Sequence, residues 1–304
     1  MTNSPTVPRR IAFDEPEELS REPEAPDDLA VGVSRETPTL PQPGAPRIMV
    51  VANQKGGVGK TTTAVNIAAG LAAGGLKVLV VDIDPQGNAS TALGVDHSEG
   101  TVGTYEVLVD QFPVIDAVQR SPESPNVWVL PATIDLAGAE IGLVATVSRE
   151  TRLKTALDAF FDHYYVDYVL IDCPPSLGLL TLNALVAAHE IMIPIQCEYY
   201  ALEGVTQLLK TINLVKGRLN DNLVLSTVLL TMYDGRTNLS SQVADEVRRH
   251  FARETLDAVI PRSVRVAEAP SYGQTVITYQ INSVGAQAYL AAATEIAQRG
   301  ATGF

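Results

Sequence analysis

The stretch that most restricts how this chain can fold is NQKGGVGKTTTAVNI, at positions 53–67. It follows the apolar run IMVVA (48–52) and opens a segment with the apolar spacing of a helix. A glycine-rich loop between a strand and a helix lets backbone N–H groups approach phosphate oxygens at the helix N-terminus. The stretch therefore predicts a phosphate-binding loop at the edge of a sheet.

Phosphate chemistry assigns roles to the side chains of this loop. Lys60 is expected to reach the β- and γ-phosphates, Thr61 to hold Mg²⁺ and Thr62 to bond the α-phosphate. The general pattern G-x-x-x-x-G-K-[ST] asks for glycine at position 54, where the chain has Gln54. A glycine-rich turn with two solvated lysines is the alternative. The rest of the predicted ATP-binding loop comprises Lys55, Gly56, Gly57, Val58 and Gly59.

The remainder of the chain alternates short apolar runs with helical patterns, which is typical of an α/β fold. Near-continuous apolar strands indicate a mostly parallel β-sheet with helices on both faces. We expect a single domain of the P-loop NTPase type over residues 47–304, closed by a helix over 283–298. The predicted strands are 48–52, 77–83, 127–130, 166–172, 190–195 and 223–231.

Residues 1–46 have a different composition. They contain nine prolines and nine acidic residues against four arginines, with little periodic apolar content. Such a segment cannot bury enough surface to offset its ordering entropy, so it is predicted to be a disordered acidic tail. It serves either as a solvating tail or as a tether for a partner such as a polar scaffold, with Ile11 and Phe13 as anchors.

Composition narrows the class of protein further. No stretch approaches the roughly 18 consecutive apolar residues of a membrane helix, and the N-terminus lacks a signal-peptide core. The two cysteines, Cys173 and Cys197, have no metal-binding spacing, which fits a reducing cytoplasm. The net charge of −13 argues against a protein that simply coats nucleic acid.

Three aspartates lie at or just past the C-terminal ends of predicted strands, where open α/β sheets bind ligands. Asp82 and Asp84 lie in DIDPQGNAST, and Asp172 ends the apolar run of VDYVLIDCPPSLG. Asp172 is similar to a Walker B acid and is expected to hold Mg²⁺ through water, with Asp82 as a possible second support. Each aspartate alone is also compatible with a helix cap or a turn.

The loop pattern K-G-G-x-G-K-[ST] resembles the deviant Walker A motif of the ParA/MinD family of P-loop ATPases. This resemblance implies that Lys55 reaches the nucleotide of a partner subunit across a dimer interface, where Gly56 must stay small. It also implies that Lys55 and Lys60 are catalytic, and that Asp84 orients or activates the attacking water. A second cation neutralises charge on the transferred phosphoryl group, as an arginine finger does.

Beyond the loop, the resemblance covers almost everything after residue 47 and is densest for the ParA/Soj branch. It includes LPATIDLAGAEIGLV, PIQCEYYALEGVTQLL, TMYDGRTNLSSQV and IPRSVRVAEAPSYGQTV. A MinD-type protein would end in a basic amphipathic helix, whereas this chain ends AQRGATGF. Nitrogenase-reductase and cluster-carrier branches need cysteines that are missing. The 46 residues in front have the wrong composition for the DNA-binding domain of plasmid-type relatives.

The resemblance also points to an adenine pocket and a DNA surface. Met232, Pro261 and Arg262 are expected beside the base, although ordinary loop packing explains them equally well. DNA binding requires a local basic patch despite the negative total charge. The expected contacts are Arg248, Arg249, Arg262 and Arg265, in a stretch that acidic residues dilute.

The resulting hypothesis is a cytoplasmic, nucleoid-associated partitioning ATPase with ATP and Mg²⁺ as cofactors. Its ATP-bound homodimer would bind double-stranded DNA without sequence preference, and a ParB-like protein would release it by stimulating hydrolysis. No membrane is involved. One alternative is a family member that positions another cargo. The other is a small-molecule P-loop kinase or ligase, which would need an acceptor pocket.

Overall fold

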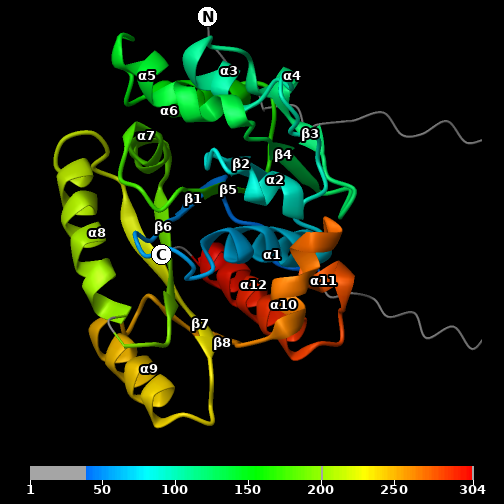
Figure 1. Cartoon of the computed structure of the whole chain (residues 1–304), viewed down its shortest axis with the longest axis vertical. Coiled ribbons are helices and arrows are strands. Elements are labelled where there is room, and N and C mark those ends of the chain that lie inside the picture. Colours follow the sequence, from blue (N-terminus) through cyan, green and yellow to red (C-terminus); the bar gives the residue numbers. More distant parts are fainter. Residues whose placement is uncertain (1–38, 200, 303–304) are drawn as a thin grey trace, which may run out of the picture.

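One mixed sheet of eight strands organises the computed structural model, in the order β3-β4-β2-β5-β1-β6-β7-β8. The structure describes residues 39–199 and 201–302, without the side chains of 201–204. All adjacent strands run parallel except β3 and β4, which are antiparallel. The chain is a single α/β domain, as the sequence predicts (Figure 1).

The strands span β1 Arg47–Val51, β2 Val78–Asp82, β3 Gln119–Arg120, β4 Val127–Leu130, β5 Tyr168–Asp172, β6 Glu190–Gln196, β7 Val224–Tyr233 and β8 Thr255–Pro261. The α-helices span α1 Lys60–Ala73, α2 Asn88–Ala92, α3 Thr104–Val109, α4 Val114–Ala117, α5 Ala139–Val144, α6 Arg152–Phe161, α7 Leu179–Ala187, α8 Ala201–Lys216, α9 Asn238–His250, α10 Val264–Glu268, α11 Val276–Tyr279 and α12 Val284–Thr302. Two 3₁₀ turns, η1 Ile134–Gly138 and η2 Ala269–Tyr272, complete the chain.

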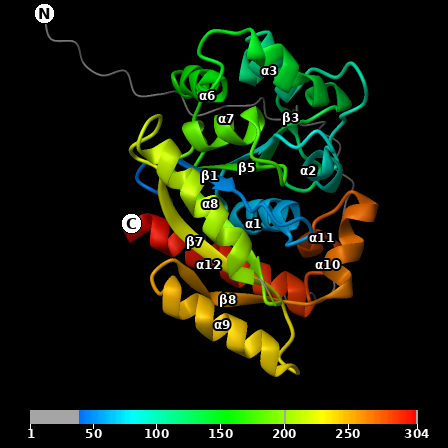
Figure 2. The same ribbon diagram turned by 60° about the vertical axis from the view of Figure 1, so that its left-hand side comes forward.

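The sheet is buried on both faces because successive strand residues point to opposite sides. In β1, Ile48 and Val50 belong to one apolar core, and Met49 and Val51 belong to the other. The first core is shared with α3 to α9, and the second with α1, α2, α11 and α12. Figure 2 shows α1 and α12 together on their side of the sheet and α3, α6 and α7 on the other side. Near-continuous apolar strands are the consequence of this double burial.

The six strands predicted from the sequence are all present, with ends within two residues of those predicted. Two further strands, β3 and β8, were not predicted. The closing helix α12 reaches Thr302, four residues beyond its predicted end. None of the helices in the described residues is long and apolar enough to cross a membrane.

The predicted division of the chain at residue 47 stays a prediction. Residues 1–38, including Ile11 and Phe13, lie outside the described residues, so the tail prediction is untested there. Residues 39–46 are described, and the backbone N–H of Leu40 donates to the carbonyl of Gly74 at 2.9 Å. The Leu40 side chain fills the space that a Cβ on Gly74 would occupy. Leu40, in the segment predicted as a tail, thus contacts the C-terminal end of α1.

Candidate nucleotide-binding site

The glycine-rich loop joins the end of β1 to the start of α1, as the sequence predicts. Gly57 and Gly59 have φ angles of 73° and 88°, in the left-handed region where a side chain is strained. Gly59 is directly followed by Lys60, the first residue of the 14-residue helix α1. The free backbone N–H groups at the start of α1 and the helix dipole therefore face the space in front of the loop. This is the geometry that binds phosphate.

Two polar side chains outside the loop hold its backbone in place, and sequence reasoning missed both. Buried Asn53 accepts from the backbone N–H of Lys55 at 3.0 Å and donates to the carbonyl of Pro194 at 2.8 Å. The hydroxyl of Thr231 donates to the carbonyl of Val58 at 2.9 Å. The loop is thus tied to β6 and β7. Only the position of Asn53 in front of the glycines signals this role.

Lys60 and the predicted acids meet behind the loop, at the ends of three adjacent strands. Asp82 of β2 and Asp172 of β5 are register partners and fully buried, while Lys60 and Asp84 are 7% and 8% exposed. The Lys60 Nζ lies 3.5 Å from the carbonyl oxygen of Lys55. Burial lowers the pKa of Lys60, against the attraction of Asp172 and Asp84. The structure therefore brings together the Lys60, Asp82, Asp84 and Asp172 side chains that the sequence singles out.

The donor set fits Mg²⁺ bound by few protein groups. Both carboxylate oxygens of Asp172 are buried with no hydrogen-bond partner in the part of the chain that is described. Burial and the neighbouring carboxylate of Asp82 raise the pKa of Asp172 well above its ordinary value. Over the same residues, no cluster of three His, Cys, Asp or Glu forms a metal cage. Mg²⁺ commonly takes one or two carboxylates and completes its shell with water and phosphate oxygens. Asp172 and the Thr61 hydroxyl would hold it here.

Asp82 differs from Asp172 because its carboxylate is already occupied. One oxygen accepts from the backbone N–H and hydroxyl of Ser90, at 2.9 and 2.7 Å, and the other from the Asp84 N–H at 3.2 Å. Burial nevertheless raises the pKa of Asp82 to about 6. The Asp82 carboxylate thus shapes the 83–90 loop. Its support of Mg²⁺ stays a prediction.

The residues expected around adenine lie together beside the phosphate loop. Met232, Pro261 and Arg262 line a cavity of about 200 Å³ that also contacts Gly59 and Thr62. Met232 has a φ of 51°, uncommon for a residue with a side chain. The cavity also includes Tyr289 of α12, which sequence reasoning missed. An apolar slot that opens onto a phosphate loop is suited to a flat heterocycle.

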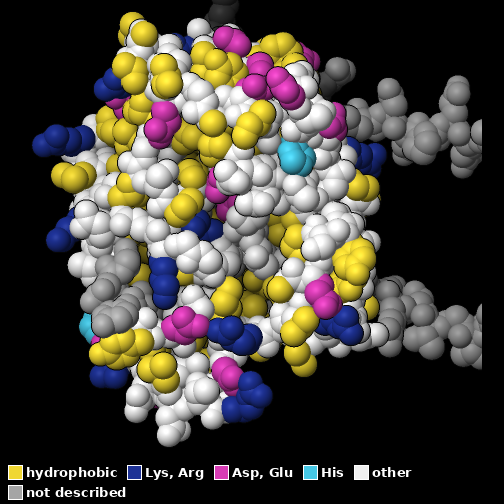
Figure 3. Space-filling view, viewed as in Figure 1, with side chains coloured by type: hydrophobic (Ala, Val, Ile, Leu, Met, Phe, Trp, Pro, Cys, Tyr) yellow, Lys and Arg dark blue, Asp and Glu magenta, His cyan; other side chains and the backbone are white. Residues whose placement is uncertain are grey.

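The four arginines expected to bind DNA do not form one cluster along the backbone. Arg248 and Arg249 end α9, before β8 begins, whereas Arg262 and Arg265 follow the end of β8. The seven-residue strand β8 lies between the two pairs along the chain. Arg262 pairs with Glu198 at 2.8 Å and Arg265 with Glu268 at 2.9 Å. In Figure 3, Lys and Arg side chains lie over α8 and α9.

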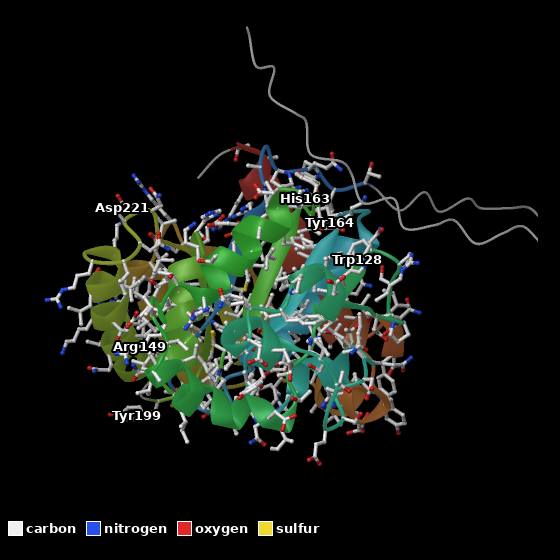
Figure 4. All side chains as sticks on the ribbon, turned by 90° about the horizontal axis from the view of Figure 1, so that it is seen from above. Trp128, Arg149, His163, Tyr164, Tyr199 and Asp221 are labelled. Carbon is white, nitrogen blue, oxygen red and sulfur yellow. The ribbon has the colours of Figure 1, made fainter. Side chains whose placement is uncertain are left out.

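Labelled side chains in Figure 4 mark two sides of the sheet: the side where the parallel strands end and the side where they begin. Tyr199, which follows the end of β6, and Arg149, which precedes α6, project from one side. His163 and Tyr164, which precede β5, lie on the opposite side. The phosphate loop follows the C-terminal end of β1, and Asp172 is the last residue of β5. Both therefore lie on the same side of the sheet as Tyr199. The nucleotide site therefore lies at the C-terminal ends of the strands, on the side opposite the start of β1.

Comparison with known proteins identifies the family. An AAA domain family profile matches residues 46–225. Sporulation initiation inhibitor protein Soj of Bacillus subtilis is 54% identical over 254 residues, which cover 84% of this chain and 99% of Soj. The chain belongs to the ParA/Soj family. Chromosome partitioning protein ParA of Caulobacter vibrioides is 51% identical over 253 residues, covering 83% of this chain and 94% of ParA. ParA/Soj proteins are P-loop ATPases, and this chain is an ATPase of that type.

A solved structure agrees with the ParA/Soj fold while bearing another name. It is described as cobyrinic acid a,c-diamide synthase from Mycobacterium smegmatis, with bound ATP analogue and magnesium. Its TM-score is 0.72 at 41% identity, and the match covers 84% of this chain and 96% of that one. The resemblance to the ParA/Soj branch inferred from sequence is confirmed.

Proposed function

We propose that this chain is a DNA-partitioning switch that ATP closes and hydrolysis opens. ATP and Mg²⁺ bind in the loop of residues 55–62, and two copies then close face to face with Lys55 directed to the partner's nucleotide. The closed dimer binds duplex DNA without sequence preference. A partner of the ParB type stimulates hydrolysis, after which the dimer opens and releases the DNA.

The observation that carries this proposal is that the charged side chains are buried on one side of the loop, while two of its glycines are exposed on the other. Lys60, Asp84 and Asp172 are buried behind the loop, whereas Gly56 and Gly57 are exposed in front of it. A nucleotide held by the loop would meet water on the side of Gly56. A second copy that covers this side would exclude water, which strengthens the electrostatic interactions that lower the barrier to phosphoryl transfer.

Apolar side chains exposed near this edge support closure by a second copy. Ile134, Ile141 and Val144, in η1 and α5, are 61%, 80% and 61% exposed, and Leu177 in the loop after Asp172 is 40% exposed. Figure 3 shows hydrophobic side chains gathered over α3 and α5. Clustered exposed apolar residues mark interaction sites, because burying them is favourable.

Each charged group of the site has a role in hydrolysis under this proposal. Lys60, and Lys55 of the facing copy, neutralise charge that develops on the transferred phosphoryl group. Asp84 orients the attacking water. Mg²⁺ held by Thr61 and Asp172 supplies further charge neutralisation on the phosphates.

DNA binding then depends on ATP because dimer closure sets the spacing of arginines from two subunits. Arg248, Arg249, Arg262 and Arg265 are expected to contact phosphates rather than base edges, since no base-reading motif is present. Such binding weakens steeply with salt. The net charge of −13 does not oppose it, because affinity follows the local patch.

The deciding experiment measures binding to arbitrary duplex DNA at 50 and 200 mM salt, without nucleotide, with ADP and with ATP. We expect binding only with ATP and a loss of on the order of 10³-fold at the higher salt. Lys60→Ala is the control that should abolish both hydrolysis and binding. The absence of binding in every nucleotide state would shift the function to positioning another cargo. ATP turnover that required a small-molecule acceptor would instead favour a kinase or ligase.

A further inference from the structure

The position of Asp84 depends on a side chain that does not touch the phosphate loop. The Asp84 backbone N–H donates to one carboxylate oxygen of Asp82, and the other oxygen accepts from the N–H and hydroxyl of Ser90. Asp82 and Ser90 are both completely buried, so water cannot replace these hydrogen bonds. The orientation of the Asp82 carboxylate, and with it the backbone at Asp84, is therefore fixed by Ser90.

The Ser90 hydroxyl also contacts a different segment of the chain. It accepts from the backbone N–H of Ala132, just after β4, at 3.1 Å, while its own proton goes to Asp82. Both hydrogen-bonding functions of the hydroxyl are thus used, with Asp82 at one end and Ala132 at the other. One side chain links the loop after β2 to the chain leaving β4.

Two further contacts strengthen this link between the exits of β2 and β4. The Thr104 hydroxyl donates to the carbonyl of Asp82 at 2.7 Å and lies 3.1 Å from the carbonyl of Pro131. A Cβ built on Gly87 would lie 2.8 Å from the carbonyl oxygen of Ala132, so the Asp84 loop is packed directly against that residue. Displacement of residues 131–133 would therefore be transmitted to the Asp84 loop.

The chain that leaves Ala132 leads to η1 and α5, where Ile134 and Ile141 are exposed. We infer that Ser90 is a positioning residue for ATP hydrolysis: through Asp82 it holds Asp84 in place and couples Asp84 to the 131–144 segment. This inference rests on the role proposed for Asp84. Ser90 itself touches neither substrate nor phosphate loop, so its removal should slow turnover without weakening ATP binding.

The test is a double-mutant cycle on the full-length protein, with steady-state hydrolysis of radiolabelled ATP in the presence of Mg²⁺ as the readout. Ser90→Ala is expected to lower kcat by on the order of 10- to 100-fold, because small misplacements of a catalytic group have effects of this size. The KM for ATP should stay within about twofold of wild type, since the loop is unchanged. In an Asp84→Ala background, Ser90→Ala should have no further effect.

Three additional variants make the result interpretable. Ser90→Thr keeps the hydroxyl and should recover much of the lost rate, and Ser90→Cys replaces Ser90→Ala if the latter does not fold. Thr91→Ala, on the same short helix but exposed and bonded to Gly87 and His97, is the matched control and should hydrolyse normally.

Each remaining outcome overturns a defined part of the argument. Wild-type turnover in Asp84→Ala would remove the role proposed for Asp84, and the inference with it. A slow Asp84→Ala protein together with a normal Ser90→Ala protein would overturn the inference alone. The same would follow if Ser90→Ala raised the KM in parallel with its loss of kcat, or slowed Asp84→Ala further.

Discussion

At the scale of single residues, glycine at position 56 is not required by the fold of one subunit but would be required by a dimer. It is exposed, and a Cβ at this position would contact nothing within 4 Å. Nothing within the described subunit therefore requires glycine there, whereas a second copy closing over the loop would. We expect Gly56→Leu to bind ATP normally but to weaken ATP-dependent dimerisation by on the order of 10- to 100-fold, since overpacking costs about 1–3 kcal/mol.

Sedimentation velocity with and without ATP, together with binding of a fluorescent ATP analogue, measures the two effects separately. Gly56→Ala, with one added methyl group, is the graded control. If Gly56→Leu dimerised like wild type, the loops would not meet at this residue, and the proposed insertion of Lys55 would be wrong.

Site residues that belong to short local sequence motifs could be predicted from the sequence. Lys60 and Asp172 lie in motifs that adjoin predicted strands, and the structure places both behind the loop. The contacts of Asn53 to Pro194 and of Ser90 to Ala132 could not be predicted, because these partners are 141 and 42 residues away and are backbone groups. Almost any residue type can supply a backbone carbonyl or N–H group, so the residue at the partner's position does not reveal the contact.

At the scale of elements, a buried ion pair connects central strands at the ends away from the nucleotide site. Arg47 of β1 donates to Glu190 of β6 through Nε at 2.6 Å and Nη2 at 2.5 Å. Arg47 also donates to the Tyr168 hydroxyl of β5 and to the carbonyl of Ile296 in α12. The guanidinium therefore joins three strands and the last helix.

Glu190→Ala should destabilise the fold by about 3–5 kcal/mol, because it leaves the Arg47 charge buried without a partner. The double variant Arg47→Met, Glu190→Leu should cost less than the single change, since neither charge remains. Lys154→Ala breaks an exposed pair with Asp158 and should cost below about 1 kcal/mol. Urea unfolding gives all three values. Equal losses for Glu190→Ala and Lys154→Ala would mean that burial does not control the strength of these pairs.

The strands missed from sequence show where periodicity stops being informative. β3 has two residues, too few for any pattern. β8 has the sequence TLDAVIP, with an exposed Asp257 and a terminal proline, and lies at the edge of the sheet. Its pairing with β7 contains two register shifts, so side chains do not alternate regularly. An edge strand tolerates such a sequence because only one side is paired.

At the scale of the whole molecule, the separation of the two arginine pairs determines how DNA would be contacted. One pair lies at the end of α9 and the other follows β8, and each guanidinium that neutralises a phosphate contributes separately to the salt dependence. The effects of the two pairs on this salt dependence are therefore expected to add. Replacing Arg248 and Arg249 by alanine removes four arginines from the dimer and should reduce the slope of log affinity against log salt by about 3.6, and so should replacing Arg262 and Arg265.

The acidic partners of the second pair lead to an opposite prediction. Arg262 and Arg265 are bound to Glu198 and Glu268, which compete with DNA phosphates for the same guanidinium groups. Replacing both glutamates by glutamine removes this competition, so ATP-dependent DNA affinity should rise and the salt slope should steepen. Fluorescence anisotropy titrations at four salt concentrations measure both quantities. The control for the same gain of net charge replaces the exposed Asp110 and Asp162, which follow α3 and α6, by asparagine. An equal rise in affinity for this control would mean that long-range charge, rather than release of these two arginines, governs binding. A fall in affinity for the glutamine variant would place the DNA on another surface.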